Sequence, residues 1–530
     1  MRCAYANIGT ADRPRLIHYR TAGEGPPLLM LHASPLSSKS LVPLAEALAP
    51  HATVLALDTP GYGQSDPLAE DPRGQGLSAY VEAIEGFRRA MGYARVGIYG
   101  TATGAQIAIE YARAYPERCS FLIADNAAHF SDDDREAITD GYFPDLTVDD
   151  LGGHLIRTWS LARDQLLFFP WQDPAARLPN AGLDPAFTDI FARQILEAGP
   201  RYAWAYREAF FNEKAERLLD VTVPTTLMRW AGSIIKPYTD RFDEYEIPAH
   251  FRMQVCGPSM GDRISGLIHA VTHHQNQVAN GLTGAAGAPA EAPRTYIDRL
   301  HLRVTGSGRP LLLLHQPGFD SRTAQPLATV LGTAFRCLAP DLPGHGASGP
   351  SKDLAADVVE LYERLAETEG ESLPVLALGE SAALATLLHE RFGCPMTLLN
   401  PRPVDNSPDA LPALGPRSSG AHWLEIWHWL RMRQMFAPWY KTQPDSALTG
   451  TPVLDGETLT AQLKAVLACT DLPATLAQLA ALPSPNLDRG RWLTLAETPL
   501  GDAARKAFPD APWQSPIQLH QLAESLEDLL

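Results

Sequence analysis

The stretch that decides the fold is RVGIYGTATGAQIAIEYARAY, residues 95–115. Its first six residues form a short, mostly apolar run, which is typical of a buried strand. From Gly104 onward the apolar residues have helical spacing. The turn between them, residues 100–104, has glycine at both ends, as required where a strand and a helix crowd together. A strand, a tight turn and a helix in this order predict one strand–helix unit of an α/β domain.

The same alternation extends outward from this stretch. Further strands are predicted at residues 27–32, 52–58, 119–125, 223–230 and 250–256, and helices at 40–48 and 77–91. Strands separated by helices predict a mostly parallel sheet with helices on both faces. Residues from about 130 to 218 break the alternation and are helical and rich in aromatic residues. We expect them to form a cap over the carboxyl ends of the strands, where such sheets bind ligands.

The second half of the chain repeats the first. Residues 15–32, RLIHYRTAGEGPPLLMLH, align with residues 298–315, DRLHLRVTGSGRPLLLLH, at an offset of 283. The pattern Asp-x-Pro-Gly-x-Gly-x-Ser recurs at the same offset, at residues 58–65 and 341–348. A block with His154, Trp159, Arg163 and Pro170-Trp171 recurs at residues 422–439, with a smaller offset. The chain therefore contains two copies of one design, and the second copy has lost residues between these blocks.

We predict two domains from this repeat. The first spans residues 1–279 with its cap at about 130–218, and residues 280–293 form a linker rich in Gly, Ala and Pro. The second spans residues 294–530, with strands near 310–315, 335–341, 374–379 and 396–400, a cap at about 405–482 and a truncated C-terminal part. We expect the copies to pack as an internal pseudo-dimer. A further homo-oligomer is left open.

Composition narrows the class of partner. The 44 Lys and Arg against 61 Asp and Glu give a net charge of −17, which disfavours nucleic acid. No apolar run reaches the roughly 20 residues that cross a bilayer. The six cysteines are scattered without a CxxC pair, and the N-terminus has no apolar signal core, so we expect a cytoplasmic protein with reduced thiols. No nucleotide-binding loop or metal-ligand spacing occurs, so no metal and no cofactor are expected.

Two turns carry a resemblance to a known family. Residues 100–104, GTATG, and 379–383, GESAA, each follow an apolar strand and precede a helix. With the Leu-His ends of the early strands and the two Asp-x-Pro-Gly-x-Gly-x-Ser loops, they resemble the α/β-hydrolase superfamily. The resemblance covers nearly the whole chain. It implies two tandem α/β-hydrolase folds, each with a helical cap.

The resemblance also implies a Ser-His-Asp triad, which the residues do not supply. The nucleophile position of the first copy is Ala102, which has no lone pair. The expected acid loop, 231–237, holds no carboxylate, and the expected His loop, 257–263, holds no His. Asp125 is a substitute acid. In the second copy Ser381 is placed on the turn, but Asn400 and Trp513 stand at the acid and His positions. We interpret Ser381 chiefly as a small residue at a crowded turn.

Other groups are candidates for chemistry in the first copy. The backbone N–H groups of Ala33 and Thr103 would form an oxyanion hole. The catalytic candidates are His32, Ala102, Asp125, His154 and Arg163. The substrate-binding candidates are Ala33, Thr103, His129, Trp159, Trp171 and Ser381. Trp159 and Arg163 share a helix face and suit an anionic, partly aromatic ligand. The alternative is structural: an ion pair for Arg163, cap packing for Trp159 and a loop hydrogen bond for His32.

Three functions fit these residues. The leading hypothesis is an enzyme of the superfamily that cleaves a small organic molecule, by hydrolysis or related C–C or C–X cleavage, in the capped pocket of the first domain. The second is a non-catalytic protein that binds a ligand or scaffolds a partner. The third is a serine hydrolase inactivated by replacement of its nucleophile, which predicts a His near Ala102. An open polar pocket favours the enzyme, and pockets filled by side chains favour the scaffold.

Overall fold

The computed structural model describes residues 1–530 except 11, 180, 278–291, 484–489 and 528–530. The chain divides into two compact units. Unit 1 contains Met1–Thr147 and Arg157–Ala292, and unit 2 contains Val148–Ile156 and Pro293–Leu530. The predicted linker, 280–293, lies outside the described residues except for its last two positions.

Unit 1 is built on an eight-stranded sheet with the order β1-β2-β4-β3-β5-β6-β7-β8. Its strands are β1 (Arg2–Asn7), β2 (Leu16–Ala22), β3 (Pro27–Leu31), β4 (Thr53–Leu57), β5 (Val96–Thr101), β6 (Cys119–Asp125), β7 (Thr225–Trp230) and β8 (Phe251–Cys256). The pairs β1–β2 and β2–β4 are antiparallel, and all the others are parallel. The predicted mostly parallel sheet is confirmed, while β1 and β2 lie outside the predicted strand ranges, which begin at residue 27.

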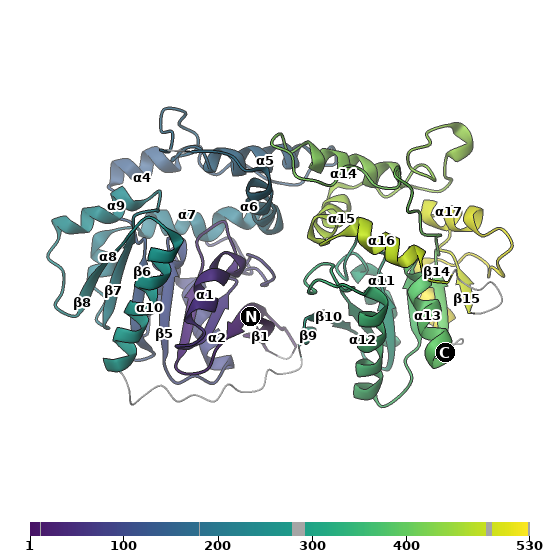
Figure 1. Ribbon diagram of the computed structural model, residues 1–530, viewed down its shortest axis with the longest axis horizontal. Coiled ribbons are helices and arrows are strands. Elements are labelled where there is room, and N and C mark those ends of the chain that lie inside the picture. The colour runs from purple at the N-terminus through teal and green to yellow at the C-terminus, as the bar shows by residue number, and fades with distance from the viewer. Residues whose placement is uncertain (11, 180, 278–291, 484–489, 528–530) are drawn as a thin grey trace. The chain divides into compact units, whose positions relative to one another are not determined.

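Helices cover both faces of this sheet (Figure 1). One face carries α1 (Val42–Leu48) and α10 (Met260–Gln277), whose leucines pack against strand residues such as Tyr99 and Ile123. The other face carries α2 (Ser78–Ala90) and α3 (Thr103–Ala114), which contact each other, and α3 also packs on β5 and β6. The central strands are buried on both sides, which explains why they are apolar runs without alternation.

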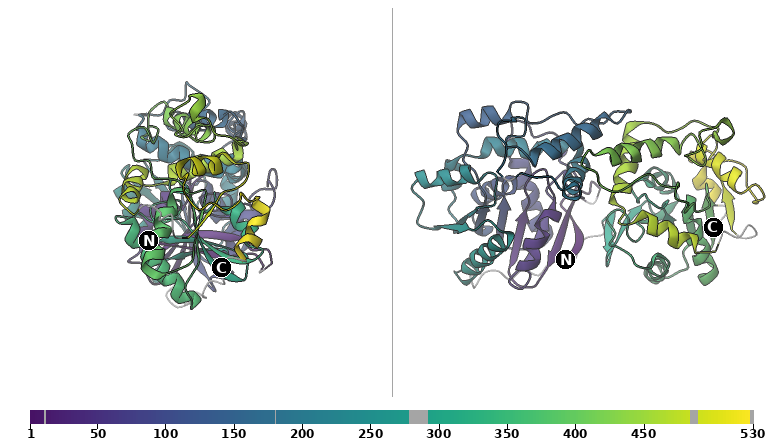
Figure 2. Two further views of the ribbon diagram at one scale, coloured as in Figure 1. Left: turned by 90° about the vertical axis from the view of Figure 1, so that its right-hand side faces the viewer. Right: turned by 45° about the horizontal axis from the view of Figure 1, so that its top comes forward.

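A helical insertion separates β6 from β7. It contains α4 (Asp132–Thr139), α5 (Gly153–Gln165), α6 (Pro185–Ala198), α7 (Ala203–Asn212) and α8 (Ala215–Leu219), with the 3₁₀ turn η2 (Gly199–Tyr202). The turn η1 (Ser38–Leu41) precedes α1, and α9 (Lys236–Asp240) and η3 (Arg241–Glu244) follow β7. The insertion lies along one end of the unit 1 strands in both orientations (Figures 1 and 2). It leaves the sheet directly after Asp125, so that end is the carboxyl edge of β6.

Unit 2 repeats this sheet without its last strand. Its strands are β9 (Arg294–Ile297), β10 (Leu300–Thr305), β11 (Arg309–Leu314), β12 (Phe335–Pro340), β13 (Val375–Leu378), β14 (Met396–Leu399) and β15 (Arg491–Leu493). Their order, β15-β14-β13-β11-β12-β10-β9, matches β7 back to β1 of unit 1. In place of β8, the described residues form only two isolated bridges, Trp492 with Trp513 and Leu495 with Ile517.

The helices of unit 2 also follow the plan of unit 1. They are α11 (Gln325–Leu331), α12 (Leu354–Glu369), α13 (Ala382–Phe392), α14 (Ala421–Met432), α15 (Gly456–Ala468), α16 (Leu472–Ala480), α17 (Pro499–Ala507) and α18 (Leu522–Glu527). The 3₁₀ turns are η4 (Gly379–Ser381), η5 (Pro444–Ser446) and η6 (Leu519–Gln521). Helices α14–α16 lie between β14 and β15 in sequence, as α4–α8 lie between β6 and β7.

Candidate functional site

The turn between β5 and α3 holds Ala102 in a strained backbone conformation. Its φ is 48° and its ψ is −117°, a region that side-chain-bearing residues rarely adopt. The flanking glycines are required by close approach. A Cβ at Gly100 would lie 2.1 Å from the carbonyl oxygen of Gly104, and a Cβ at Gly104 would lie 2.3 Å from that of Leu31. Ala102 itself is half-buried. We call this turn, Gly100–Gly104, the unit 1 elbow.

Two backbone N–H groups flank the unit 1 elbow. Thr103 is the first residue of α3, and Ala33 follows β3, which pairs with β5 through Leu31 and Gly100. Among the described residues no acceptor is found for the N–H of Ala33 or of Thr103. Both groups lie at the carboxyl edge of neighbouring parallel strands and remain the candidates for the predicted oxyanion hole.

Both ring nitrogens of His32 form hydrogen bonds with backbone groups of neighbouring loops. Its Nδ1 lies 2.9 Å from the carbonyl oxygen of Ala33, and its Nε2 accepts from the N–H of Thr59 at 3.1 Å. The Thr59 hydroxyl lies 3.0 Å from the same nitrogen. Burial lowers the pKa of His32 despite the nearby charge of Asp58. Both ring nitrogens are engaged, so His32 holds β3 to the loop after β4, as the structural alternative expects, and its catalytic role stays a prediction.

Asp125 faces Arg263 in the sheet. Arg263 Nε donates to Asp125 Oδ2 at 2.8 Å, and Arg263 Nη2 donates to the Thr101 hydroxyl at 2.8 Å. The Tyr99 hydroxyl donates to Asp125 Oδ2 at 2.6 Å. Asp125 is fully buried, and its Oδ1 is buried without a partner in the described structure. Burial opposes ionisation of Arg263, but the charges of Tyr99 and Asp125 outweigh it and raise the pKa of the guanidinium.

This network occupies the region where the family resemblance implies acid and His. Arg263 lies in the first turn of α10, which follows β8. Its guanidinium lies over the ring of Trp230, 4.7 Å from the ring centroid. Trp230 is the last residue of β7, the strand after which an acid is implied. The hydrogen bonds to Asp125 therefore come from Arg263 and Tyr99. Burial raises the pKa of Asp125, although Arg263 and Tyr99 oppose the shift. Its role as a substitute acid stays a prediction, for a carboxyl group that a guanidinium holds.

An aromatic cluster lies between the insertion and the carboxyl edge of unit 1. Its buried members are Ala128, Phe130, Ile138, Tyr142 and Phe210, and Phe143, Phe169, Trp171, Tyr206, Ile235 and Tyr238 pack against them. Ala128 and Phe130 follow directly after β6, and Phe210 is on α7, which packs on α3. Trp171 Nε1 donates to the carbonyl oxygen of Tyr142 at 2.9 Å, so its indole is anchored in the cluster.

Glu213 is a buried carboxyl group beside this cluster, and no sequence motif indicated it. It follows α7, and only 5% of its surface is exposed. Its backbone carbonyl oxygen accepts from the N–H of Phe130 at 3.0 Å, which holds the residue against the strand exit. Burial raises the pKa of Glu213 to about 8, although the charge of Arg135 opposes this shift. The side chain of its neighbour Asn212 donates to Gln106 Oε1 at 3.1 Å. This hydrogen bond joins the end of α7 to α3, the helix that follows the unit 1 elbow.

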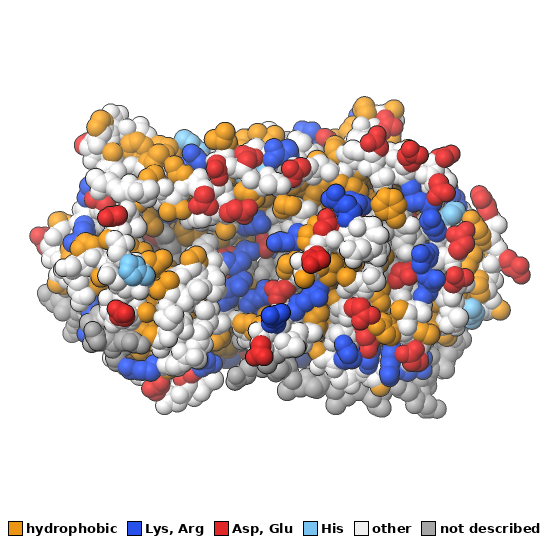
Figure 3. All heavy atoms as spheres, turned by 180° about the vertical axis from the view of Figure 1, so that it is seen from behind, with side chains coloured by type: hydrophobic (Ala, Val, Ile, Leu, Met, Phe, Trp, Pro, Cys, Tyr) orange, Lys and Arg blue, Asp and Glu red, His pale blue; other side chains and the backbone are white. Residues whose placement is uncertain are grey.

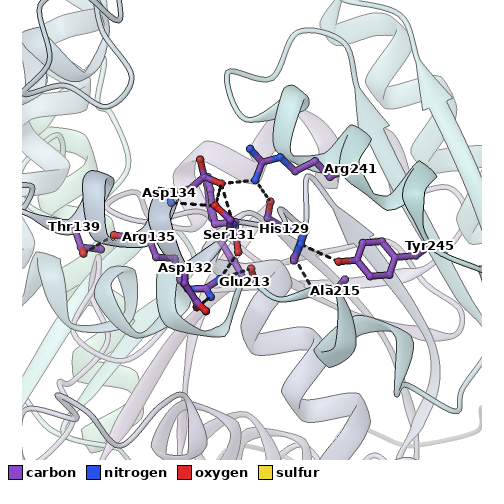
Figure 4. A network of polar contacts seen from close by, with 11 residues as sticks. His129, Ser131, Asp132, Asp134, Arg135, Thr139, Glu213, Ala215, Arg241 and Tyr245 are labelled. Atoms are coloured by element: carbon purple, nitrogen blue, oxygen red, sulfur yellow. Dashed lines mark hydrogen bonds and ion pairs between the residues drawn. The ribbon is translucent and has the colours of Figure 1, made fainter.

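His129 belongs to a separate network at the exit of β6 (Figure 4). Its Nδ1 accepts from the N–H of Ala215 at 3.0 Å, and its Nε2 lies 3.0 Å from the Tyr245 hydroxyl. Arg241 donates to the His129 carbonyl oxygen at 3.2 Å and also bonds Asp134. Burial lowers the pKa of His129. The ring thus joins the insertion to the segment after η3. Both ring nitrogens already have partners, and the predicted contact of His129 with substrate stays a prediction.

The predicted residues of α5 fall into different surroundings. His154 lies in unit 2, where its Nε2 is 2.9 Å from the Thr460 hydroxyl, so its assignment to the pocket of the first domain is wrong. Arg163 forms a bidentate ion pair with its neighbour Asp164, at 2.8 and 3.0 Å. Trp159 is 3% exposed. Arg163 and Trp159 therefore match the structural alternatives considered for them.

The corresponding turn of unit 2 is shifted relative to the sequence motif. Leu314 pairs with Ala377 as Leu31 pairs with Gly100, so the position of Ala102 is taken by Gly379, with φ 56°. Ser381 lies two residues further, and its hydroxyl donates to the His315 carbonyl oxygen at 2.6 Å. The placement of Ser381 on the elbow is therefore wrong, because its register corresponds to Gly104.

Side chains cover this second turn. A Cβ at Gly379 would lie 3.2 Å from Gln316 Cδ. Gln316 Nε2 donates to Glu380 Oε2 at 2.7 Å, and Arg433 Nη2 lies 3.6 Å from Glu380 Oε1. Arg433 lies over the rings of Trp429 and Phe319, and burial lowers its pKa to about 10. Gln316 and Glu380 stand where unit 1 has Ala33 and Thr103, so unit 2 covers with side chains a turn that unit 1 leaves half-buried.

Other features of the described chain bear on the class of site. None of the described helices combines the length and hydrophobicity needed to span a membrane. No group of three or more His, Cys, Asp or Glu among the described residues is arranged to hold a metal ion. Acidic and basic side chains are interspersed on the face shown in Figure 3, despite the net charge of −17.

Two family models match the chain, one in each half. The family model described as alpha/beta hydrolase fold matches residues 26–233, and the model described as Alpha/beta hydrolase family matches residues 311–524. The 2-hydroxy-6-oxo-6-phenylhexa-2,4-dienoate hydrolase of Comamonas testosteroni is 31% identical over 115 residues, 20% of this chain and 38% of that protein. The 2-hydroxy-6-oxononadienedioate/2-hydroxy-6-oxononatrienedioate hydrolase 2 of Pseudomonas putida is 32% identical over 127 residues, 22% of this chain and 43% of that protein.

These matches span less than half the length of either relative. Among solved structures, the bromoperoxidase of Bacillus anthracis is similar at a TM-score of 0.39 and 17% identity. That likeness covers 52% of this chain and 99% of that one.

Proposed function

Because this chain belongs to the α/β-hydrolase fold family, with two tandem domains, we propose that its first domain is an enzyme acting on a small oxo acid or ester without a serine nucleophile. The observation that carries this proposal is the half-buried Ala102 flanked by the unpartnered N–H groups of Ala33 and Thr103. A preorganised pair of amide donors stabilises negative charge on a carbonyl oxygen, whatever group attacks it.

The first step follows from the geometry of the unit 1 elbow. A substrate carbonyl oxygen that accepts from Ala33 and Thr103 places its carbon over the methyl group of Ala102. Ala102 forms no acyl-enzyme, so either water attacks the carbonyl carbon or the carbonyl accepts electrons from a breaking C–C bond. In both cases the two amides stabilise the oxyanion or enolate that develops.

Glu213 is the group we assign to proton transfer. A carboxyl with a pKa of about 8 is partly protonated near neutral pH, so it can donate a proton to a leaving carbon or take one from water. The aromatic cluster offers apolar and quadrupolar surface for the rest of the substrate. The names of the two hydrolase relatives describe oxo-dienoates, molecules with both a ketone and a carboxylate, which supports this substrate class.

The second domain is assigned a non-catalytic role. Gln316 and Glu380 cover the turn at Gly379, and Ser381 donates its hydroxyl to a backbone carbonyl. A hydroxyl held in this way has no base and cannot act as a nucleophile.

The test uses the full-length protein and a panel of 2-hydroxy-6-oxo-dienoates and simple aryl esters. Substrate loss is followed by absorbance and binding by calorimetry. Ala33→Gln copies the residue of unit 2 and should weaken binding at least ten-fold, whereas the matched Gln316→Ala variant in unit 2 should leave binding unchanged. Glu213→Gln should lower kcat at least ten-fold with little change in KM. Equal binding by the parent protein and Ala33→Gln would overturn the proposed site.

A non-catalytic binding protein is the second candidate function. It is supported by the Asp125–Arg263 ion pair, which occupies the region where the family carries its acid and base. Ligand binding that is abolished by Ala33→Gln, without turnover of any panel member, would favour this function over the enzyme.

A further inference from the structure

A second cluster of reactive side chains lies at the β1 edge of the unit 1 sheet, away from the elbow. Cys3 of β1 pairs with Arg20 of β2, and His18 lies two residues earlier on the same face of β2. Arg20 Nη1 donates to Cys3 Sγ at 3.2 Å. His18 Nδ1 lies 2.8 Å from Asp58 Oδ2, directly after β4. Cys3 is half-buried, whereas His18 and Asp58 are buried.

The carboxylate of this cluster is rigidly held. Asp58 Oδ1 accepts from the N–H of Ser38 at 2.7 Å, and Oδ2 accepts from the N–H of Gln64 at 2.9 Å. A fixed carboxylate on Nδ1 orients the imidazole and stabilises its protonated form, as in Cys-His-carboxylate catalytic sites. Tyr5 of β1 packs its ring edge-on against His18, at 5.2 Å between centroids. The groups that face Cys3 are therefore His18, Arg20 and, through His18, Asp58.

These contacts favour the thiolate. Burial and the charge of Asp58 raise the pKa of Cys3, but the neighbouring His18 and the charge of Arg20 outweigh them, so the pKa is lowered. The other five cysteines, Cys119, Cys256, Cys337, Cys394 and Cys469, all have their pKa raised by burial. Cys469 is also half-buried, and its pKa is raised to about 12, which makes it an internal reference.

Unit 2 shows that the fold does not require this cysteine. His301 Nδ1 and Asp341 Oδ2 form the same pair at 3.0 Å, and Tyr296 packs on His301 as Tyr5 packs on His18. The partner of Arg303 in β9 is Arg294, which stands where unit 1 has Cys3. The His–Asp pair therefore has a structural role in both units, and only unit 1 places a thiol beside it.

We propose that Cys3 is a thiolate modification site that reacts with peroxides and other small electrophiles. The Cys3 sulfur attacks one oxygen of a peroxide, the O–O bond breaks, and the leaving hydroxide takes the proton of the His18 imidazolium to give water. The sulfur is oxidised to the sulfenic acid and the peroxide is reduced, so no further reagent is needed. Arg20 and Asp58 remain charged throughout and hold the sulfur and the imidazole in place.

The experiment measures site-resolved alkylation of the full-length protein by iodoacetamide between pH 5.5 and 9.5, with peptide mass spectrometry. At pH 7 we expect Cys3 to react at least ten times faster than Cys469, because the thiolate is the reacting species. His18→Gln should slow Cys3 at pH 7 about ten-fold and move its rate profile to higher pH. The matched variant His301→Gln in unit 2 should leave the Cys3 profile unchanged. Circular dichroism checks that each variant is folded.

Hydrogen peroxide followed by dimedone provides the oxidation readout. We expect the dimedone adduct on Cys3 before any other cysteine, and its yield should fall in His18→Gln. Alkylation of Cys3 no faster than of Cys469, or a Cys3 profile that His18→Gln does not move, would overturn the proposal. A milder variant, Arg20→Gln, keeps the test valid if His18→Gln fails to fold. It should slow Cys3 in the same direction, and no change would count against the thiolate.

Discussion

The unit 1 elbow and the corresponding turn of unit 2, at Gly379, have the same backbone path but differ in the side chains that surround them. Both end a central strand at a residue with positive φ, Ala102 in unit 1 and Gly379 in unit 2. Unit 1 leaves this residue half-buried between two free amides, whereas unit 2 covers it with Gln316 and Glu380. The sheet order and the Asp-anchored loops are shared. The difference teaches that a few side chains at the end of the central strand decide how exposed the turn is, while the strand order of the sheet is the same in both units.

The largest effect is expected from Arg263→Met. This change leaves the fully buried Asp125 without its cation, and breaking a buried pair costs about 3–5 kcal/mol of unfolding free energy. Unit 2 carries Leu399 at the register of Asp125, so adding Asp125→Leu should recover more than half of the loss. Urea denaturation measures both values. The exposed Arg364 of unit 2 is the control, because Arg364→Met should cost less than about 1 kcal/mol. Equal losses in the two Arg variants would contradict the comparison.

Exchanging the elbow residues should give effects of opposite sign. Gly379→Ala places a Cβ at φ 56° and 3.2 Å from Gln316, which should cost about 1–2 kcal/mol. Ala102→Gly relieves the positive φ of unit 1 and should stabilise it by about 1 kcal/mol, less the added chain entropy of glycine. Thermal and urea unfolding of the two variants provide the measurement. A loss of stability in Ala102→Gly would show that the elbow is unstrained.

The two His–Asp pairs should titrate on opposite sides of the ordinary histidine value. Burial opposes protonation of His18, but Asp58 and Cys3 outweigh it and raise its pKa; burial, aided by Arg303 and Arg294, lowers the pKa of His301. The stabilisation from His18 is therefore complete below the ordinary pKa of about 6.5 and is lost as pH rises through its raised folded-state pKa. The stabilisation linked to neutral His301 is present above about 6.5 and is lost as pH falls toward its lowered pKa.

NMR titration of the imidazole carbons measures this difference. Cys3→Ser should lower the pKa of His18, and Arg294→Cys should raise that of His301, since each change removes the residue that distinguishes the two pairs. A His18 that titrates below His301 in the parent protein would contradict this account.

The smallest expected effect is that of Ala102→Ser on esterase activity. The serine gains an oxyanion hole but no base, because His32 bonds Thr59 and Asp125 bonds Arg263. Turnover of p-nitrophenyl acetate should stay within about two-fold of the parent protein. A hundred-fold gain would instead indicate that a single replacement had inactivated an ordinary serine hydrolase.

The sequence predicted the framework well because its signals are local. The apolar runs of β3 to β8 and the glycines of the unit 1 elbow can be read directly from neighbouring residues. The repeat offset predicted the second sheet for the same reason. The site was predicted less well, because partners such as Asp125 and Arg263 are 138 positions apart and pair only in the folded sheet.

Two further errors have identifiable causes. Ser381 was aligned by its motif, but strand register depends on hydrogen bonds between β11 and β13, and these place Gly379 at the elbow. Glu213 carried no motif, because an acidic residue after a helix is common and its burial is set by the aromatic cluster.

The Asp125–Arg263 pair also limits the mutational routes open to this domain. Placing a histidine at position 263 removes the guanidinium from Asp125 and from the ring of Trp230 in one step. A working triad also requires a serine at position 102 and a freed carboxylate. A histidine at position 263 therefore costs stability by itself, before any hydrolytic activity appears. The ion pair and a Ser-His-Asp triad would need the same two positions, 125 and 263, so the domain can hold one of them but not both.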